Sequence, residues 1–583
     1  MSDKTAGPPF VALVVGPAGA YAVGADVDEA WPLADVVRRL VDTSERLQPR
    51  WVVWSAASTL RDVVAARVPV SRTWDLAEAH RIVHGGWWAT PGHVVAGCRG
   101  LDEAAVPAPR TPRLHGFDGD LFDVAAGDDA ALLTPEGHLR ADALAWATDD
   151  DRLRRLAVLA LECRDAQGAA LDRLGGAHVA RLERTVWSES AAAVLCLELE
   201  RDGLPVDRPA AEDLISGSAG PRPSDEADAA RIRGERDAAV LRHAPGRERT
   251  DLRNPGQVRE LLQSVGVDVP NTRAWVLEPY RHTHPLVDAL LGWRKDERIA
   301  TTYGYRWLDE HVGPDDRLRG AWTACDGAAG RMTAQNGLHN LPTPLRPAVC
   351  AAAGHVFVRA DLGQIEPRVL AVVSGDRAFT EATRADDLYA PVAAKLGADR
   401  PRAKVAVLAA MYGQRSGAAG EALKDLERAY PVAMGLLDRA YADGVARRPV
   451  RTWGGRLIRF GGVPAAALEP GAPEPSGSAE FSATGADGAR GRYARNAIIQ
   501  GSAAELFKAW AATVRHAVRP LGGQIVLCLH DELLVHVPEE AAAQAAAAVE
   551  HSLTAAARTW AGTAEVRFVA DTSVIRRWSE AKP

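Results

Sequence analysis

Short apolar runs alternate with longer Ala-, Leu- and Arg-rich segments through the first third of the chain. The runs Phe10–Val15 and Trp51–Trp54 are short and uninterrupted, which is typical of buried strands. Strands of this kind, separated by segments of helical composition, indicate an α/β sheet. We therefore expect residues 1–187 to form an α/β domain.

The pattern changes after residue 187. From residue 188 to about residue 310 the chain reads as largely helical, and Asn254 followed by Pro255 favours the cap and first position of a helix. Apolar runs typical of strands return around Val356–Ala360 and on both sides of His530. Between them, residues 461–491 are rich in Pro, Gly, Ala and Ser, which predicts a flexible loop insertion.

Polar residues cluster where the predicted strand Val356–Ala360 ends. Asp361 is the first of them, and Gln364, Glu366 and Arg368 follow shortly afterwards. An acid at the end of a strand is common, so this pattern alone indicates little about function.

A basic stripe follows on a predicted helix. Arg400, Lys404, Leu408 and Tyr412 recur at every fourth position, so on a helix they lie on one face. Two cations, an apolar residue and an aromatic residue in that order suit a triphosphate followed by a base. An amphipathic helix with an exposed basic edge explains the spacing equally well.

The apolar stretches around His530 predict a β-hairpin with His530, Asp531 and Glu532 at its turn. Acids at a hairpin turn are usually only solvated. If the hairpin lies beside the strand that carries Asp361, however, the two aspartates repel each other and require cations between them.

These three segments, in this order, resemble the palm and fingers motifs of the bacterial DNA polymerase I family (family A DNA polymerases). The segments Gly330–Pro342, Arg492–Ala504 and Arg577–Ala581 resemble further motifs of the same family. The resemblance spans roughly residues 250–583. It points to the short type that lacks a 5′-nuclease domain and is named as a bifunctional 3′–5′ exonuclease/DNA polymerase.

The resemblance implies an α/β multidomain fold. We expect a right-hand polymerase with palm, fingers and thumb, preceded by an RNase H-like 3′–5′ exonuclease-like domain. The expected domains are 1–187 (exonuclease-like, degenerate), 188–315 (thumb, mostly helical), 316–371 (first part of the palm), 372–487 (fingers, running into the insertion 461–491) and 488–583 (second part of the palm).

The resemblance also implies a chemistry, DNA-templated addition of dNTPs to a primer 3′-hydroxyl. Two Mg²⁺ ions are expected to be held by Asp361 and Asp531, with Glu532 in a supporting role. Arg400 and Lys404 are expected to contact the triphosphate, and Lys404 to protonate the leaving pyrophosphate. The expected nucleotide-binding residues are Gln364, Glu366, Tyr389, Arg400, Lys404, Leu408 and Tyr412. The expected DNA-binding residues are Arg331, Asn340, Arg368, Arg492, Asn496, Gln500 and His530.

By resemblance, three of these residues, Glu366, Leu408 and Tyr389, influence which nucleotide sugar is accepted. Glu366 is expected to exclude a ribose 2′-hydroxyl, partly through a hydrogen bond to Tyr412. Leu408 stands where the family has an aromatic residue and Tyr389 where it has a histidine, which predicts weaker nucleotide affinity or altered sugar discrimination. A basic set in the same region predicts a phosphate-facing surface: Arg490, Arg492, Arg495, Lys508, Arg515 and Arg519.

The N-terminal domain lacks the acids that a two-metal exonuclease needs. The run Phe10–Val15 contains no carboxylate, and we interpret Asp26 with Asp28, and Asp149 with Asp150, as helix starts. The acidic stretch 118–129 is interpreted as a surface loop. We expect no proofreading. Two alternatives stay open: an active exonuclease built from other acids, and a non-catalytic DNA-binding descendant of a polymerase.

Composition adds little to this interpretation. The chain has 583 residues and a net charge of −7, which neither supports nor excludes DNA binding because the local field of a cleft matters more. Six cysteines without a Cys-x-x-Cys motif suggest neither zinc nor a disulfide framework. The sequence shows no signal peptide and no apolar run of transmembrane length, so we expect a cytoplasmic protein. The resemblance implies primer-template DNA as the partner and repair or gap filling as the role, and we expect a monomer.

Overall fold

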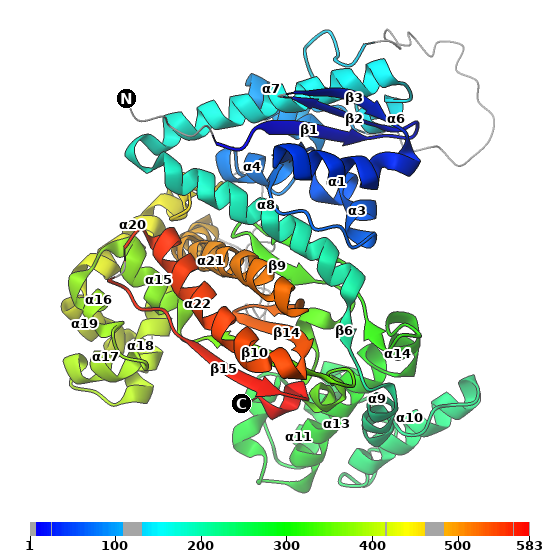
Figure 1. Ribbon diagram of the computed structural model, residues 1–583. Helices are drawn as coiled ribbons and strands as arrows, with labels where there is room; N and C mark the ends of the chain where they lie inside the picture. The colour runs from blue at the N-terminus through cyan, green and yellow to red at the C-terminus, as the bar shows by residue number, and fades with distance from the viewer. Residues whose placement is uncertain are drawn as a thin grey trace, which may run out of the picture.

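The computed structural model describes residues 7–24, 26–108, 131–413, 417–460, 483–563 and 565–581. An N-terminal α/β domain lies above a larger C-terminal part, and helix α8 (Val179–Asp202) runs between them (Figure 1). No helix in these ranges is both long and apolar enough to cross a bilayer. The expected cytoplasmic location stays a prediction.

The N-terminal domain is built on a mixed five-stranded sheet in the order β3-β2-β1-β4-β5. Strands β1 to β3 are antiparallel, whereas β4 and β5 run parallel to β1. Apolar side chains on the two faces of the sheet belong to two separate cores, so the sheet is covered on both sides. The strands are Phe10–Val15, Ala20–Gly24, Val27–Trp31, Arg50–Val53 and Thr73–Asp75, and the principal helices are α1 (Val36–Leu47), α3 (Arg61–Ala65), α4 (Leu76–Val83), α5 (Pro91–Arg99) and α7 (Asp150–Gly175).

The two acidic helix starts predicted in this domain have different outcomes. Asp149 caps α7, because its carboxylate accepts a hydrogen bond from the amide of Arg152. The prediction for Asp28 is wrong, because Asp28 lies in β3, which pairs with β2. Its carboxylate is bound by Tyr21 and Arg154. The stretch 118–129 lies outside the described residues.

Helix α8 joins the two parts of the molecule. Its side chains enter three cores: Leu182 and Val186 pack in one N-terminal core, Val194 and Leu197 in the other, and Leu195 in the core of the C-terminal part. The predicted boundary at 187/188 therefore falls inside a continuous helix.

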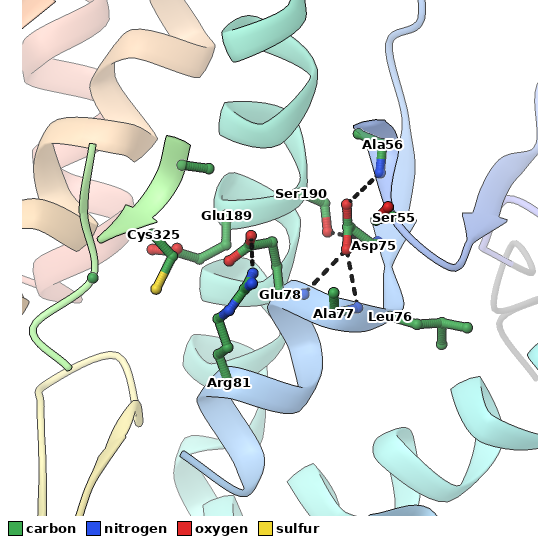
Figure 2. A network of polar contacts seen from close by, with 12 residues as sticks. Ser55, Ala56, Asp75, Leu76, Ala77, Glu78, Arg81, Glu189, Ser190 and Cys325 are labelled. Carbon is green, nitrogen blue, oxygen red and sulfur yellow. Dashed lines mark hydrogen bonds and ion pairs between the residues drawn. The ribbon is translucent and has the colours of Figure 1, made fainter. Parts of the chain in front are cut away.

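Buried polar contacts accompany α8 along this junction (Figure 2). Asp75 caps α4 by accepting hydrogen bonds from the amides of Ala77 and Glu78, and its other oxygen accepts one from the amide of Ala56. Its own amide donates to the Ser190 hydroxyl on α8. Glu189, also on α8, is paired at 2.5 Å with both Arg456 and Lys508, which belong to the C-terminal part. The junction is thus held by hydrogen-bonded charges as well as by apolar packing.

A helical region with its own apolar core follows α8. As predicted, Asn254 caps a helix that begins at Pro255, and its side chain accepts hydrogen bonds from the amides of Gly256 and Gln257. The helices are α9 (Arg208–Ala219), α10 (Glu226–Leu241), α11 (Pro255–Ser264), α12 (Ala274–Leu277), α13 (Pro285–Thr302) and α14 (Tyr305–His311).

The C-terminal part is organised around a four-stranded antiparallel sheet in the order β13-β14-β10-β15. Helices α21 (Ala483–Val518) and α22 (Ala542–Ala561) pack against it. The strands are β13 (Gln524–Leu529), β14 (Glu532–Pro538), β10 (His355–Leu362) and β15 (Ala570–Ile575), and a smaller pair is formed by β8 (Trp322–Asp326) and β9 (Arg331–Ala334).

A second group of helices lies on the far side of this sheet from α9–α14 (Figure 1). It comprises α15 (Ile365–Ser374), α16 (Arg377–Ala382), α17 (Tyr389–Leu396), α18 (Arg400–Tyr412), α19 (Gly417–Ala429) and α20 (Pro431–Val445). The predicted boundaries at 371/372 and 487/488 fall inside α15 and α21. Residues 461–482 of the predicted insertion lie outside the described residues, and 483–491 belong to α21.

Candidate active site

Strand β10 brings Asp361 to the centre of the C-terminal sheet. Asp361 lies opposite Glu532 on β14 and opposite Asp571 on β15. The predicted hairpin is confirmed: His530, with φ +54°, and Asp531 form the turn between β13 and β14. The amide of Leu362 donates to the carbonyl of Asp531 at 2.9 Å, which fixes the turn beside Asp361.

Burial and neighbouring charges raise the pKa of both aspartates. Burial, and then the charge of Asp361, raise the pKa of the Asp531 carboxyl to about 7. Burial also raises the pKa of Asp361, and the carboxylates of Glu532 and Asp571 add to this while Arg359 opposes it. A carboxyl whose pKa is raised by a neighbouring carboxylate favours a bound cation between the two.

Glu532 is engaged differently from the aspartates. Its Oε1 accepts a hydrogen bond from Nε of Arg359 at 2.7 Å and another from the indole of Trp578 at 3.0 Å. No group of three or more His, Cys, Asp and Glu side chains within the described ranges is arranged to hold a metal ion. Asp361 and Asp531 therefore offer two hard oxygen ligands, which fit a divalent cation whose other ligands come from outside the protein.

A cavity of about 490 Å³ opens beside these acids. Nine of the predicted site residues line it, drawn from β9, α15, α17, α18, α21 and the hairpin turn: Arg331, Gln364, Glu366, Tyr389, Leu408, Tyr412, Gln500, His530 and Asp531. The sequence motifs thus converge on one cavity although they are far apart in the chain.

Gln364 occupies a strained turn at the edge of this cavity. Its backbone has φ +56°, in the left-handed region that few non-glycine residues adopt. Its side chain donates to Asp387 at 2.8 Å and accepts from the amide of Leu388 at 2.8 Å. Gln364 therefore ties the end of β10 to the start of α17.

Glu366 faces two phenols across the cavity. Burial raises the pKa of Glu366, opposed by Arg331. Burial and the charge of Glu366 raise the pKa of Tyr412, and the same two causes raise that of Tyr389 to about 12. Both tyrosines therefore stay protonated and can act as hydrogen-bond donors at neutral pH.

The predicted basic stripe lies on α18, and its two cations are exposed. Arg400 donates through Nε to Asp387 at 2.5 Å, and its guanidinium lies 5.7 Å from the ring centre of Tyr389. Lys404 is exposed one turn further along α18. Leu408 and Tyr412 continue the stripe into the cavity.

One predicted DNA contact, Arg368, is not supported by the structure. Arg368 is completely buried, and its guanidinium donates to five main-chain carbonyls, of Gly363, Thr383, Ala385, Asp386 and Arg567. It positions the loops around it and has no surface to offer DNA. Asn340 and Arg492 are exposed, and Asn496 is partly buried with an unpaired Oδ1.

The predicted phosphate-facing surface is wrong for three of its six members. Arg495, Lys508 and Arg515 are buried, and they bind Asp438, Glu189 and Glu198 respectively. Arg519 also pairs with Glu198. The number of basic residues predicted a surface, but Arg495, Lys508 and Arg515 lie on faces of α21 that turn toward the interior.

Sequence reasoning missed Arg359 and Asp387. Arg359 lies two residues before Asp361 on the same strand, so both side chains lie on the same face of the sheet. That spacing was a usable signal. Asp387, just before α17, binds both Gln364 and Arg400. These residues are far apart in the sequence, so only the folded structure reveals the contacts.

In the described residues of the N-terminal domain, as in those of the C-terminal part, no group of three or more potential metal ligands is found. Asp75, the buried acid at the end of β5, is occupied as the cap of α4 (Figure 2). Burial, and then the charge of Glu78, raise its pKa to about 7. Glu78 itself pairs with Arg81 at 2.5 Å.

Comparison with known proteins extends these observations. The model of DNA polymerase family A matches residues 242–580. "DNA polymerase I, thermostable" of Thermus filiformis is 29% identical over 341 residues, which are 54% of this chain and 38% of that protein. "DNA polymerase I" of Chloroflexus aurantiacus is 29% identical over 315 residues, 48% of this chain and 31% of that protein. The matched segments thus span well under half the length of these relatives.

The fold has a counterpart among solved structures. The POL domain of Pol1 from M. smegmatis, in complex with DNA primer-template and dNTP, superimposes with a TM-score of 0.66 at 21% sequence identity. The match covers 99% of this chain and 96% of that chain. The predicted α/β multidomain polymerase fold is confirmed, and the exonuclease-like nature of its N-terminal domain stays a prediction.

Proposed function

The chain belongs to DNA polymerase family A, and from this membership we propose that it is a DNA-templated DNA polymerase that adds dNTPs to a primer 3′-hydroxyl. The observation that carries the proposal is the pairing of Asp361 with Asp531 beside a cavity lined by residues from the fingers and palm motifs. Members of this family use divalent metal ions.

We assign the metal to Asp361 and Asp531, with two Mg²⁺ ions as the expected complement. When bound, such ions neutralise charge on the attacking and leaving oxygens of a phosphoryl transfer. Arg359 holds Glu532 and Asp361 in place by hydrogen bonds of 2.7 Å each. Glu532 is then a supporting residue, buried against Trp578.

Arg400 and Lys404 are proposed to bind the triphosphate. Both are exposed on the first turns of α18, where their charges can neutralise phosphate oxygens. Arg400 must leave Asp387 to do so, because its Nε donates to that carboxylate. Lys404 is proposed to donate the proton that the leaving pyrophosphate takes up.

Sugar and base selection are assigned to the cavity walls. Glu366, beside Tyr412 and Tyr389, is proposed to occupy the space that a ribose 2′-hydroxyl would need. Leu408 offers an aliphatic surface to the incoming nucleotide. Arg331 and Gln500 are proposed to donate to minor-groove acceptors, which every correct base pair presents. His530 is assigned to the primer terminus.

The remaining assignments are proposals of the same kind. The proposed thumb is 188–315, the palm 316–371 with 488–583, and the fingers 372–487. Asn340, Arg492 and Asn496 are proposed to contact DNA. We propose a role in gap filling without proofreading, because Phe10–Val15 carries no carboxylate and the buried Asp75 is engaged as the cap of α4. Mg²⁺ as the ion, the monomeric state, the cytoplasmic location and the short type without a 5′-nuclease stay predictions.

The test is primer extension with Mg²⁺, comparing dNTPs with rNTPs and a matched primer with a 3′-mismatched one. We expect the wild type to extend with dNTPs and to leave the mismatch uncut, and Asp361→Ala to extend nothing. Glu366→Ala is expected to narrow the preference for dNTPs. Removal of the mismatched nucleotide would reveal an active exonuclease, and DNA binding without extension would identify a non-catalytic descendant.

A further inference from the structure

A second cavity lies between α8, α21 and α22. Its volume is about 550 Å³, and it shares no lining residue with the active-site cavity. Helix α21 borders both, through Gln500, Ala503, Ala504 and Phe507 on one side and Ala509, Ala512, Thr513 and His516 on the other. At about 100° per residue, these two sets lie on opposite faces of the helix.

The lining of this cavity is positively charged. It contains four arginines and one histidine but no carboxylate: Arg181, Arg184, Arg515, Arg519 and His516. Arg515 and Arg519 are balanced by Glu198. Arg181 and Arg184, on α8, form no ion pair with any described residue of the chain.

The acid that acts electrostatically on Arg181 is already bound elsewhere. Glu505 is close enough to Arg181 to affect its pKa, but its two oxygens accept hydrogen bonds from the Thr452 hydroxyl and the Gly454 amide. Burial lowers the pKa of Arg181, and Arg184 lowers it further. The Arg181 guanidinium lies 3.9 Å from the ring centre of Trp453, which stabilises its charge without neutralising it. Among the described residues no carboxylate forms an ion pair with either guanidinium, so both can accept an anionic ligand.

Buried hydrogen-bond donors without partners also indicate that the cavity binds a ligand. Nε of Arg181, Nε of Arg184 and the indole Nε1 of Trp560 all line or border the cavity, and none has a hydrogen-bond partner in the described structure. Trp560 is only 5% exposed. A buried donor left unpaired costs about 1–3 kcal/mol, so three together favour an acceptor-rich ligand. Phosphate oxygens are such acceptors and suit guanidinium groups.

The rest of the lining suits a flat ring. Five alanines form small apolar contacts: Ala191, Ala509, Ala512, Ala555 and Ala556. Trp187 is 36% exposed at the cavity, with the Arg50 guanidinium 4.4 Å from its ring centre. Aromatic faces stack on nucleobases with little regard to base identity. The volume lies within the roughly 300–1,000 Å³ typical of small-molecule sites.

We propose that this cavity is a binding site for a nucleoside phosphate, with the phosphate on Arg181 and Arg184 and the base against Trp187 and the alanines. The ligand is held rather than hydrolysed, because no carboxylate lines the cavity to bind catalytic metals. The proposal does not depend on polymerase activity. A free nucleotide and a nucleotide unit of a single DNA strand both present the phosphate and the base that this cavity would bind.

The test is isothermal titration of the full chain with dAMP in the presence of EDTA, which suppresses metal-dependent binding. Adenosine and inorganic phosphate, titrated separately, are each expected to bind at least tenfold more weakly than dAMP. Arg184→Gln is expected to weaken dAMP binding at least tenfold. Arg400→Gln, in the active site, and Arg259→Gln, an exposed position on α11, are expected to leave it unchanged.

Two further measurements complete the design. Thermal unfolding of each variant identifies loss of fold, and Ala512→Leu provides a second variant that fills the cavity without changing charge. A short oligonucleotide, 5′-phosphorylated oligo-dA, that binds more tightly than dAMP and depends on Arg184 would identify a strand as the source. Absence of dAMP binding, or binding that Arg400→Gln weakens and Arg184→Gln does not, would overturn the proposal.

Discussion

Arg359 donates a hydrogen bond from Nη2 to Oδ2 of Asp361 at 2.7 Å, two residues further along the same strand. The same guanidinium donates through Nε to Glu532. A protein cation thus stands directly beside the acid assigned to the metal, and it also balances the charge of a glutamate that is only 6% exposed.

Removing this cation is expected to destabilise the protein. Arg359→Met leaves Glu532 buried without its charge partner, which costs about 3–5 kcal/mol. Glu532→Gln in the same chain removes that charge and can still accept from the Trp578 indole, so we expect it to restore more than half of the loss. Urea unfolding of the two single variants and the double variant measures the coupling. Simple additivity of the two effects would contradict the pairing.

Asp361 and Asp531 are expected to be indispensable, whereas their neighbour Asp571 is not. Asp361→Asn and Asp531→Asn should each reduce primer extension by at least about a thousandfold while primer-template binding persists, because phosphoryl transfer requires the bound ions. Asp571→Asn is the matched control. Asp571 lies opposite Asp361 on β15, but its side chain is 66% exposed, so extension should stay within a few-fold of the wild type. An equal loss of primer extension in all three variants would mean that Asp571, on the edge strand β15, also belongs to the metal site.

Leu408→Phe is expected to improve nucleotide binding. Leu408 lines the cavity between Tyr412 and Tyr389 and is only partly buried, so a larger ring has room. Steady-state kinetics should show KM for dNTPs falling several-fold, about 1 kcal/mol of added contact, with little change in kcat. Val405→Phe, at an exposed position on the same helix, is the control. An increase in KM for Leu408→Phe alone would mean that the leucine is fitted to a different ligand.

Stability is expected to depend on pH through Glu505. Burial raises the pKa of this carboxyl from 4.5 to about 7, so the folded chain holds a proton that the unfolded chain releases over this interval. Its stabilising contribution is full below about pH 4.5 and is lost as the pH rises through 7, a change of about 3 kcal/mol.

Glu505→Gln cannot titrate, which isolates this contribution from those of other groups. The free energy of unfolding of the wild type minus that of the variant should fall by about 3 kcal/mol between about pH 4.5 and about pH 8. Urea titrations at several pH values measure it. Glu550→Gln, on the exposed face of α22, should show a constant difference. A constant difference for Glu505→Gln as well would refute the raised pKa.

Local patterns predicted much of the fold and the site. The hairpin turn at His530 and Asp531, the stripe on α18 and the cap at Asn254 each depend on residues close in sequence, so spacing and turn chemistry were sufficient. Their convergence on one cavity came from the resemblance to a family and not from spacing.

The errors concern contacts between distant segments. Arg368, Arg495 and Lys508 are charged residues whose partners come from other elements. Arg368 and Arg495 donate to main-chain carbonyls and Lys508 pairs with Glu189, which the sequence gives no means of predicting. Asp28 was assigned to a helix start because its neighbours are polar, whereas pairing of β3 with β2 decides its conformation. Composition placed a boundary inside α8 because a change in composition need not coincide with the end of a helix.

Helix α8 has a consequence for the history of the molecule. Its successive turns belong to three apolar cores, so deleting the N-terminal domain would strip one flank of a helix whose other flank completes the interior of the remaining chain. Mutations that erase a nuclease chemistry leave those contacts untouched, but mutations that unfold the domain do not. Selection on solubility and folding would thus still retain a domain that has no reaction to perform, because the rest of the chain depends on α8 for part of its core.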